Sequence, residues 1–113
     1  MHELSLCRSI YAIAEKAAGT TPISTVHLDV GQLRQVVPQT LQYCWGLVVE
    51  QTSLDGSVLE INHIPAVIVC NECGVETTLK GIPIMVCGEC KSGKVHVVSG
   101  EEFLLRSLDI KES

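Results

Sequence analysis

Hydrophobic residues recur with a helical period at the start of the chain. Between Leu4 and Ala18, apolar side chains three or four positions apart form one stripe: Leu6, Cys7, Ile10, Ile13, Ala14 and Ala17. This spacing predicts an amphipathic helix. Gly19 ends the predicted helix, and Pro22 prevents it from restarting in the turn that follows.

The pattern then changes to strands and one further helix. In residues 24–30, three aliphatic side chains alternate with polar ones, which predicts a strand with one buried face. Pro38 suits the first turn of a second helix, which we expect to reach about Gln51. Further strands are predicted at residues 57–64, where Pro65 ends the run, and at residues 103–110.

Residues 65–97 have a different pattern, in which short apolar pieces are separated by turns that contain cysteine, glycine and proline. We interpret this segment as a small four-cysteine module inserted between the second and third strands. The predicted fold class is therefore α+β, with two helices packed on a three-stranded sheet. Residues 1–64 plus 98–113 would form this discontinuous α+β domain, and residues 65–97 the module.

Composition narrows the classes of partner. The chain has 8 lysines and arginines against 13 acidic residues, a net charge of −5, whereas phosphate binding needs clustered cations. No run approaches the roughly 20 apolar residues of a membrane-spanning helix, and the N-terminus lacks the features of a signal peptide. We therefore expect no nucleic-acid or membrane partner and a cytoplasmic location. Because thiols stay reduced there, six cysteines indicate metal or redox chemistry more than disulfides.

Four of the six cysteines have the spacing of a structural zinc site. Cys70 and Cys73 form one Cys-x2-Cys pair, and Cys87 and Cys90 form a second. Two such turns facing each other supply the tetrahedral set of four sulfurs that zinc prefers, and so short a segment needs the metal to fold. The alternative is a pair of redox dithiols, which would require the purified protein to lack zinc.

The remaining thiols, Cys7 and Cys44, lie on the apolar stripes of the two predicted helices. Free cysteine commonly behaves as a small buried hydrophobic residue. We therefore expect both to belong to the core and to have no chemical role.

The N-terminus offers a different set of donor atoms. Bulky His2 should keep the initiator Met1 in place, since that methionine is normally removed only before a small residue. The Met1 α-amine, the His2 amide and the His2 imidazole would then close a five-membered and a six-membered chelate ring around one ion. Such a nitrogen-rich, square-planar set suits Ni(II) or Cu(II). The simpler interpretation is a frayed terminus with no function.

The sequence does not identify the fourth ligand of such a site. Glu3 could supply a carboxylate, or it could orient the site without touching the ion. His27, His63 and His96 are alternatives if the fold brings one of them close, although a lone histidine on a strand is more often a surface residue.

Several segments occur in an order that is typical of one known family. They are the opening Met1-His2-Glu3-Leu4-Ser5-Leu6-Cys7, then Val30-Gly31, Val36-Val37-Pro38, the two cysteine pairs and the closing Leu104-Leu105-Arg106-Ser107-Leu108-Asp109-Ile110. In these segments, which span nearly the whole chain, the sequence resembles the HypA/HybF family of hydrogenase-maturation nickel chaperones.

The resemblance implies two metal sites in a protein that is not an enzyme. Nickel would be carried in the α+β domain at His2, with Met1 and Glu3, while zinc at the four cysteines would be structural. The implied partners are a HypB-like GTPase and the large subunit of [NiFe] hydrogenase, with urease maturation proteins as a further class. The expected oligomeric state is a monomer or a weak homodimer.

A zinc-ribbon adaptor that joins other proteins, without a nickel site of its own, is the main alternative. An enzyme fits less well, because the sequence shows no Ser/His/Asp arrangement, no phosphate-binding glycine loop and no open zinc position.

Overall fold

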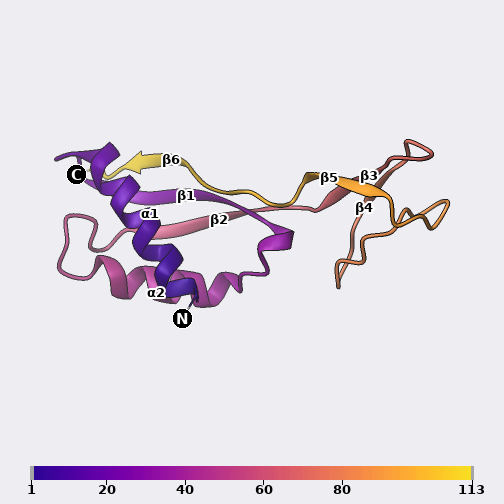
Figure 1. The fold of residues 1–113 in the computed structure, drawn as a ribbon. Helices are drawn as coiled ribbons and strands as arrows, with labels where there is room; N and C mark the ends of the chain where they lie inside the picture. The colour runs from indigo at the N-terminus through magenta and orange to yellow at the C-terminus, as the bar shows by residue number, and fades with distance from the viewer. Residues whose placement is uncertain (1, 113) are drawn as a thin grey trace. The chain divides into compact units, whose positions relative to one another are not determined.

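The computed structural model describes residues 2–112, with the side chain of His2 excepted. Nine elements follow one another within these residues, from helix α1 to strand β6 (Figure 1). The chain divides into two compact units, which we describe separately. The helical unit contains the residues up to Asp29, the segment Val36–Asn62 and the residues from Leu104 onward. The ribbon unit contains Val30–Gln35 and His63–Phe103.

The helical unit has the predicted α+β architecture. Its elements are α1 (His2–Ala18), β1 (Ile23–Gly31), α2 (Pro38–Val49), β2 (Val58–Ile64) and β6 (Phe103–Ile110). The three strands form one sheet in the order β2-β1-β6, and some of their end residues belong to the ribbon unit. Helix α1 packs against α2 and passes in front of β1 and β2 in the view of Figure 1. The prediction of two helices and a three-stranded sheet is confirmed.

The core of the helical unit follows the sequence pattern. On β1, Val26 and Leu28 are fully buried while His27 between them is not. Ser57 is the buried polar residue of this core, and its hydroxyl accepts a 3.0 Å hydrogen bond from the indole N–H of Trp45. The buried residues that the two helices contribute are Cys7, Ile10, Ala14, Leu41, Trp45 and Val49. Each set recurs every three or four positions, as expected for one helix face.

The ribbon unit contains a second sheet whose short strands were not predicted. Strand β3 (Val67–Cys70) lies between β4 (Glu76–Thr78) and β5 (Val95–Ser99), and it pairs antiparallel with both. The apolar core of this unit is small. It consists of Ala66, Ile68 and Leu79, with Leu33, Val95 and Val97 packed around them.

One segment from much earlier in the chain completes the ribbon unit. Val30–Gln35, which includes the single-turn 3-10 helix η1 (Gln32–Arg34), belongs to this unit. The N–H of Gly31 donates to the carbonyl of Glu102 at 2.7 Å, and the N–H of Leu33 donates to the carbonyl of Gly100 at 2.8 Å. These bonds hold the segment by its backbone.

Candidate metal centre

The four predicted zinc ligands come together in the ribbon unit. The Sγ atoms of Cys70, Cys73, Cys87 and Cys90 all lie within 4.8 Å of one another. Two cross-pairs, Cys70 with Cys90 and Cys73 with Cys87, are each separated by 3.6 Å. Four sulfurs at about 2.3 Å from one zinc ion would be about 3.8 Å apart in a tetrahedron. The sulfur positions therefore fit zinc.

The two cysteine pairs form equivalent turns. In the first, the N–H of Gly74 donates to the carbonyl of Cys70 at 3.0 Å. In the second, the N–H of Lys91 donates to the carbonyl of Cys87 at 3.1 Å. Both donors have positive φ, 75° for Gly74 and 63° for Lys91. Each turn thus closes in the same way, with a residue in the left-handed region directly after its second cysteine.

Backbone N–H groups prepare the first thiol of each turn for a metal. The N–H groups of Cys73 and Glu72 point at the sulfur of Cys70 and lower its pKa. The corresponding N–H groups of the second turn lower the pKa of Cys87 to about 6. The pKa of Cys73 rises to about 12, although the N–H of Val75 acts to lower it, because of its hydrogen bond with the sulfur of Cys87. Since only the thiolate binds zinc, metal binding must release protons here.

A zinc ion held by these four sulfurs would have a closed coordination shell. Catalytic zinc sites keep one position for water or substrate, whereas sites with four cysteines are structural. Cys70 and Cys87 are buried, while Cys73 and Cys90 are exposed. The centre therefore suits a structural role.

Lys91 is predicted to be a weak point of the second turn. A residue with a Cβ costs about 1–2 kcal/mol in the left-handed conformation, and glycine avoids this cost. We expect Lys91→Gly to raise the free energy of unfolding by about 0.5–1 kcal/mol, which is less than the strain it relieves because glycine also loses more backbone entropy on folding. Urea denaturation of the zinc-loaded protein measures this change.

Gly74→Lys is the matched control for this prediction. A Cβ added to Gly74 would meet no atom within 4 Å, so only backbone strain opposes the larger residue. It should lower the free energy of unfolding by about 1 kcal/mol. A stability loss in Lys91→Gly would show that the 3.0 Å bond from Lys91 Nζ to the carbonyl of Gly88 matters more than the strain.

The other two cysteines belong to the helical unit and are not part of the sulfur cluster. Cys7 is 1% exposed, its thiol donates to the carbonyl of Leu41 at 3.3 Å, and burial raises its pKa to about 12. Cys44 is half-buried. Cys7 therefore stays protonated at neutral pH and packs as a small hydrophobic residue.

Two of the predicted nickel ligands, His2 and Glu3, belong to the start of α1. Met1 and the side chain of His2 fall outside the described residues, so their geometry is not part of the structure. The described helix begins at His2 and carries Glu3 in its first turn. The first four N–H groups of a helix have no acceptor within it, and an acidic residue is favourable there.

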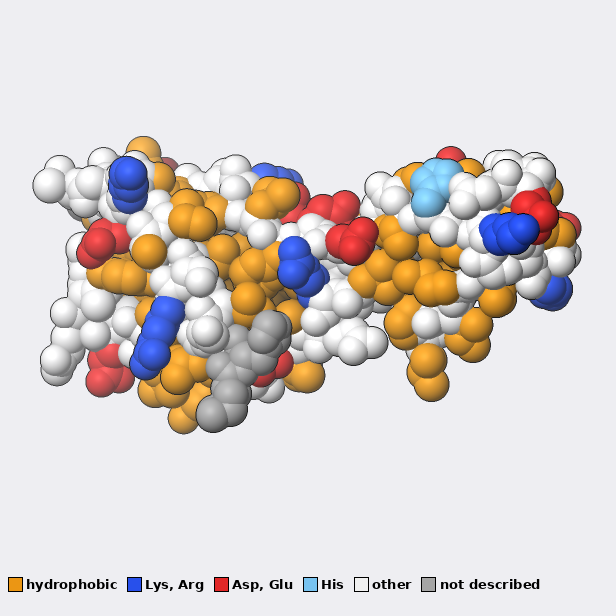
Figure 2. All heavy atoms as spheres, viewed as in Figure 1, with side chains coloured by type: hydrophobic (Ala, Val, Ile, Leu, Met, Phe, Trp, Pro, Cys, Tyr) orange, Lys and Arg blue, Asp and Glu red, His pale blue; other side chains and the backbone are white. Residues whose placement is uncertain are grey.

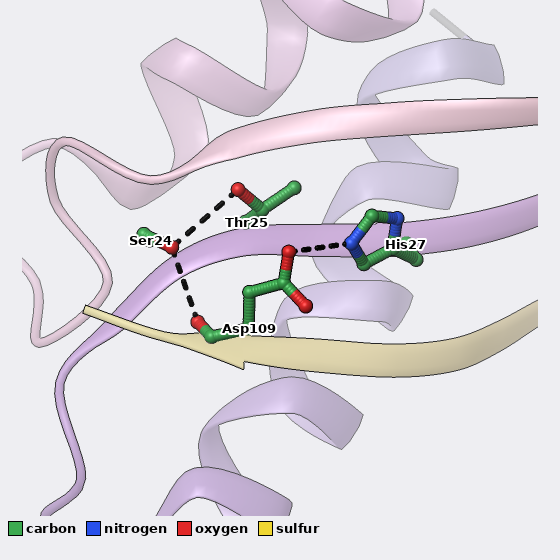
Figure 3. Close-up of polar contacts among 4 residues, drawn as sticks. All are labelled: Ser24, Thr25, His27 and Asp109. Carbon is green, nitrogen blue, oxygen red and sulfur yellow. Dashed lines mark hydrogen bonds and ion pairs between the residues drawn. The ribbon is translucent and has the colours of Figure 1, made fainter. Parts of the chain in front are cut away.

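Two of the three candidate histidines elsewhere in the chain have other partners. His27 Nε2 lies 2.8 Å from Asp109 Oδ2, which joins β1 to β6 (Figure 3). Because side chains alternate along a strand, His27 points away from the face that buries Val26 and Leu28. His96 Nδ1 lies 2.6 Å from Asn71 Oδ1, beside the first cysteine turn. His63 is exposed.

One residue that supports the centre gave no signal in the sequence. Thr77 on β4 accepts a 3.0 Å hydrogen bond at Oγ1 from the N–H of Gly88, inside the second cysteine turn. A Cβ on Gly88 would lie 3.2 Å from this oxygen. The two residues lie eleven positions apart along the chain, and no local pattern in the sequence indicates that they meet.

The fold and the sulfur cluster together define a small α+β metalloprotein with a zinc-ribbon unit. A sequence model described as "HypA: Hydrogenase/urease nickel incorporation, metallochaperone" matches residues 1–110. The chain belongs to the HypA family of metallochaperones for hydrogenase and urease nickel incorporation.

Relatives and solved structures agree with this assignment. The hydrogenase maturation factor HypA of Chlorobium limicola is 38% identical over 99% of this chain and 98% of its own length. That of a Nostoc species is 35% identical over 99% and 97%. The solution structure of the Ni metallochaperone HypA from Helicobacter pylori matches with a TM-score of 0.67 and 21% identity, covering 96% of each chain. A second HypA solution structure gives 0.69 and 23%, covering 98% and 97%. At these identities the two structures show a shared fold.

None of the described helices is both long and apolar enough to span a membrane.

Proposed function

We propose that this protein binds Ni(II) at its N-terminus and delivers it to the large subunit of [NiFe] hydrogenase. The ligands are the Met1 α-amine, the amide and imidazole of His2, and the carboxylate of Glu3. A HypB-like GTPase acts with it, and urease maturation proteins are a second destination. This assignment is supported by membership in a family described by nickel incorporation into both enzymes.

The observation that α1 begins at His2 supports the proposed nickel site on chemical grounds. The amide of His2 must lose its proton to bind the ion, and at the first position of a helix it has no intrahelical acceptor to give up. The partial positive charge of a helix N-terminus opposes a cation, and Glu3 in the first turn offsets it. Glu3 thus favours nickel binding through its negative charge as well as through a ligating oxygen.

Zinc has a separate role in this proposal. The closed set of four sulfurs holds the ribbon unit together and leaves no position for a substrate. Nickel is cargo, so its affinity must allow release. A dissociation constant on the order of micromolar, about −8 kcal/mol, meets that requirement.

The test is a calorimetric nickel titration of untagged, zinc-loaded protein with a native Met1. Wild type should bind one nickel per chain, and His2→Gln, whose bulky second residue keeps Met1 in place, should bind none at concentrations that saturate wild type, because the six-membered chelate ring needs the imidazole. Acetylation of the α-amine should cause the same loss while leaving His2 in place.

His27→Ala is the matched control, since it removes an imidazole that already pairs with Asp109. It should bind nickel as wild type does. Equal nickel binding by wild type and His2→Gln would remove the His2 imidazole from the site and leave a zinc-ribbon adaptor as the better assignment.

A further inference from the structure

An apolar groove runs between the exposed sides of α1 and α2. Leu4, Arg8 and Tyr11 line it from α1, and Leu47 and Val48 line it from α2, around a volume of about 460 Å³. Leu47 is 51% exposed. Figure 2 shows the molecule from the side of α1, where hydrophobic side chains gather over the two helices. The groove is therefore an open apolar surface of the helical unit.

Arg8 is the one polar group of this groove that is free to bind a ligand. The Tyr11 hydroxyl donates to Glu15 Oε2 at 2.6 Å, so its hydrogen is already used. Arg8 is exposed, and within the described part of the chain no carboxylate pairs with it. A guanidinium presents a planar fork of donors that matches a carboxylate. A ligand that pairs with Arg8 would therefore carry an acidic group.

The lining favours a protein segment over a small molecule or a membrane. Small-molecule pockets are concave and have several converging polar groups, whereas this groove is open and offers one. Anionic lipid surfaces attract clusters of four to eight lysines and arginines. This groove has a single arginine in a chain of net charge −5.

We propose that the groove is the docking site for an amphipathic, acidic segment of the protein that exchanges nickel with this chain. Apolar side chains of that segment cover Leu4, Leu47 and Val48, and one of its carboxylates pairs with Arg8. Leu4 directly follows Glu3, so a segment seated here lies next to the proposed nickel terminus. The inference rests on the proposed function and adds a surface to it.

The experiment compares groove variants with variants elsewhere on the same helices. Calorimetry measures binding of zinc-loaded protein to the purified maturation GTPase and to the precursor of the hydrogenase large subunit. Arg8→Glu and Leu47→Asp should each weaken binding by about tenfold or more. The controls are Lys16→Glu and Ile13→Asp, of which Ile13 is 54% exposed on a different face of α1. They should stay within about twofold of wild type.

Three further measurements make each outcome decisive. Thermal unfolding shows that the variants fold, nickel titration should still give one ion per chain, and sedimentation reports self-association. Equal binding by groove variants and wild type overturns the docking site and leaves the nickel site standing. Wild type that binds neither protein overturns the partners of the proposed function and this inference with them. Self-association that the groove variants abolish overturns it as well, since the occupant is then a second copy of the chain.

Discussion

Removal of zinc with a chelator is expected to unfold the ribbon unit while the helices of the helical unit keep their structure. Structural zinc contributes on the order of 10–16 kcal/mol in small domains. The buried residues of this unit's core cluster are Ala66, Ile68 and Leu79, and each large apolar side chain contributes only about 1.5–3 kcal/mol. Ordering the backbone costs about 1–2 kcal/mol per residue. Without the metal, this balance favours the unfolded ribbon.

Amide resonances measured by nuclear magnetic resonance separate the two units. On chelation, signals from β3, β4 and β5 should collapse to the random-coil range, whereas those from α1 and α2 should stay dispersed. Cys87→Ser should reproduce the effect in the presence of zinc. Cys44→Ser, which lies outside the sulfur cluster, should retain one zinc per chain. Dispersed β3 signals after complete removal of zinc would mean that the metal does not stabilise the unit.

Gly31→Ala is expected to destabilise the ribbon unit by roughly 3–5 kcal/mol. A Cβ at this position would lie 2.0 Å from the carbonyl oxygen of Gly100 and 2.1 Å from its carbon. Both are backbone atoms, so no side-chain rotation relieves the clash. The backbones are also fixed by the bonds of Gly31 to Glu102 and of Leu33 to Gly100. Denaturant unfolding followed at ribbon-unit amides measures the loss.

Gly46→Ala is the matched control for this substitution. Gly46 lies inside α2, and a Cβ there would meet nothing within 4 Å. Alanine in a helix interior is favoured over glycine by about 0.5–1 kcal/mol, so this variant should be more stable than wild type. A loss below about 1 kcal/mol in Gly31→Ala would show that the two backbones can separate at low cost.

The helical unit could be predicted because its signals are local. The stripe of Leu41 and Trp45 and the alternation of Val26 with His27 are readable in a window of a few residues. The predicted strands agree with β1, β2 and β6 to within one residue at each end, while α2 ends at Val49 instead of near Gln51. Ends are harder to predict because capping, more than periodicity, decides them.

The ribbon unit could be predicted only through its cysteines. Spacing alone placed four sulfurs in one cluster, because each Cys-x2-Cys turn is a local structure. Strand β4 has three residues, too few for an alternation to be recognised. The contact of Gly31 with Gly100 joins positions far apart in the sequence, and no periodicity reports such an approach. The sequence pattern gave no sign that Val30–Gln35 packs in this unit.

The ribbon unit is built from two separate segments of the chain, and this also sets the order in which its parts are synthesised. A ribosome adds about 5–20 residues per second, so roughly 3 to 14 s pass between the appearance of Gln35 and that of Phe103, where the unit ends. The residues of α2 and β2 are made first in this interval, and the second cysteine pair and β5 of the ribbon unit are made near its end. Strand β6, which pairs with β1, is made later still. A nascent chain therefore cannot assemble its zinc centre until most of it has been translated, and a ribosome that stalls earlier leaves a product without either completed sheet.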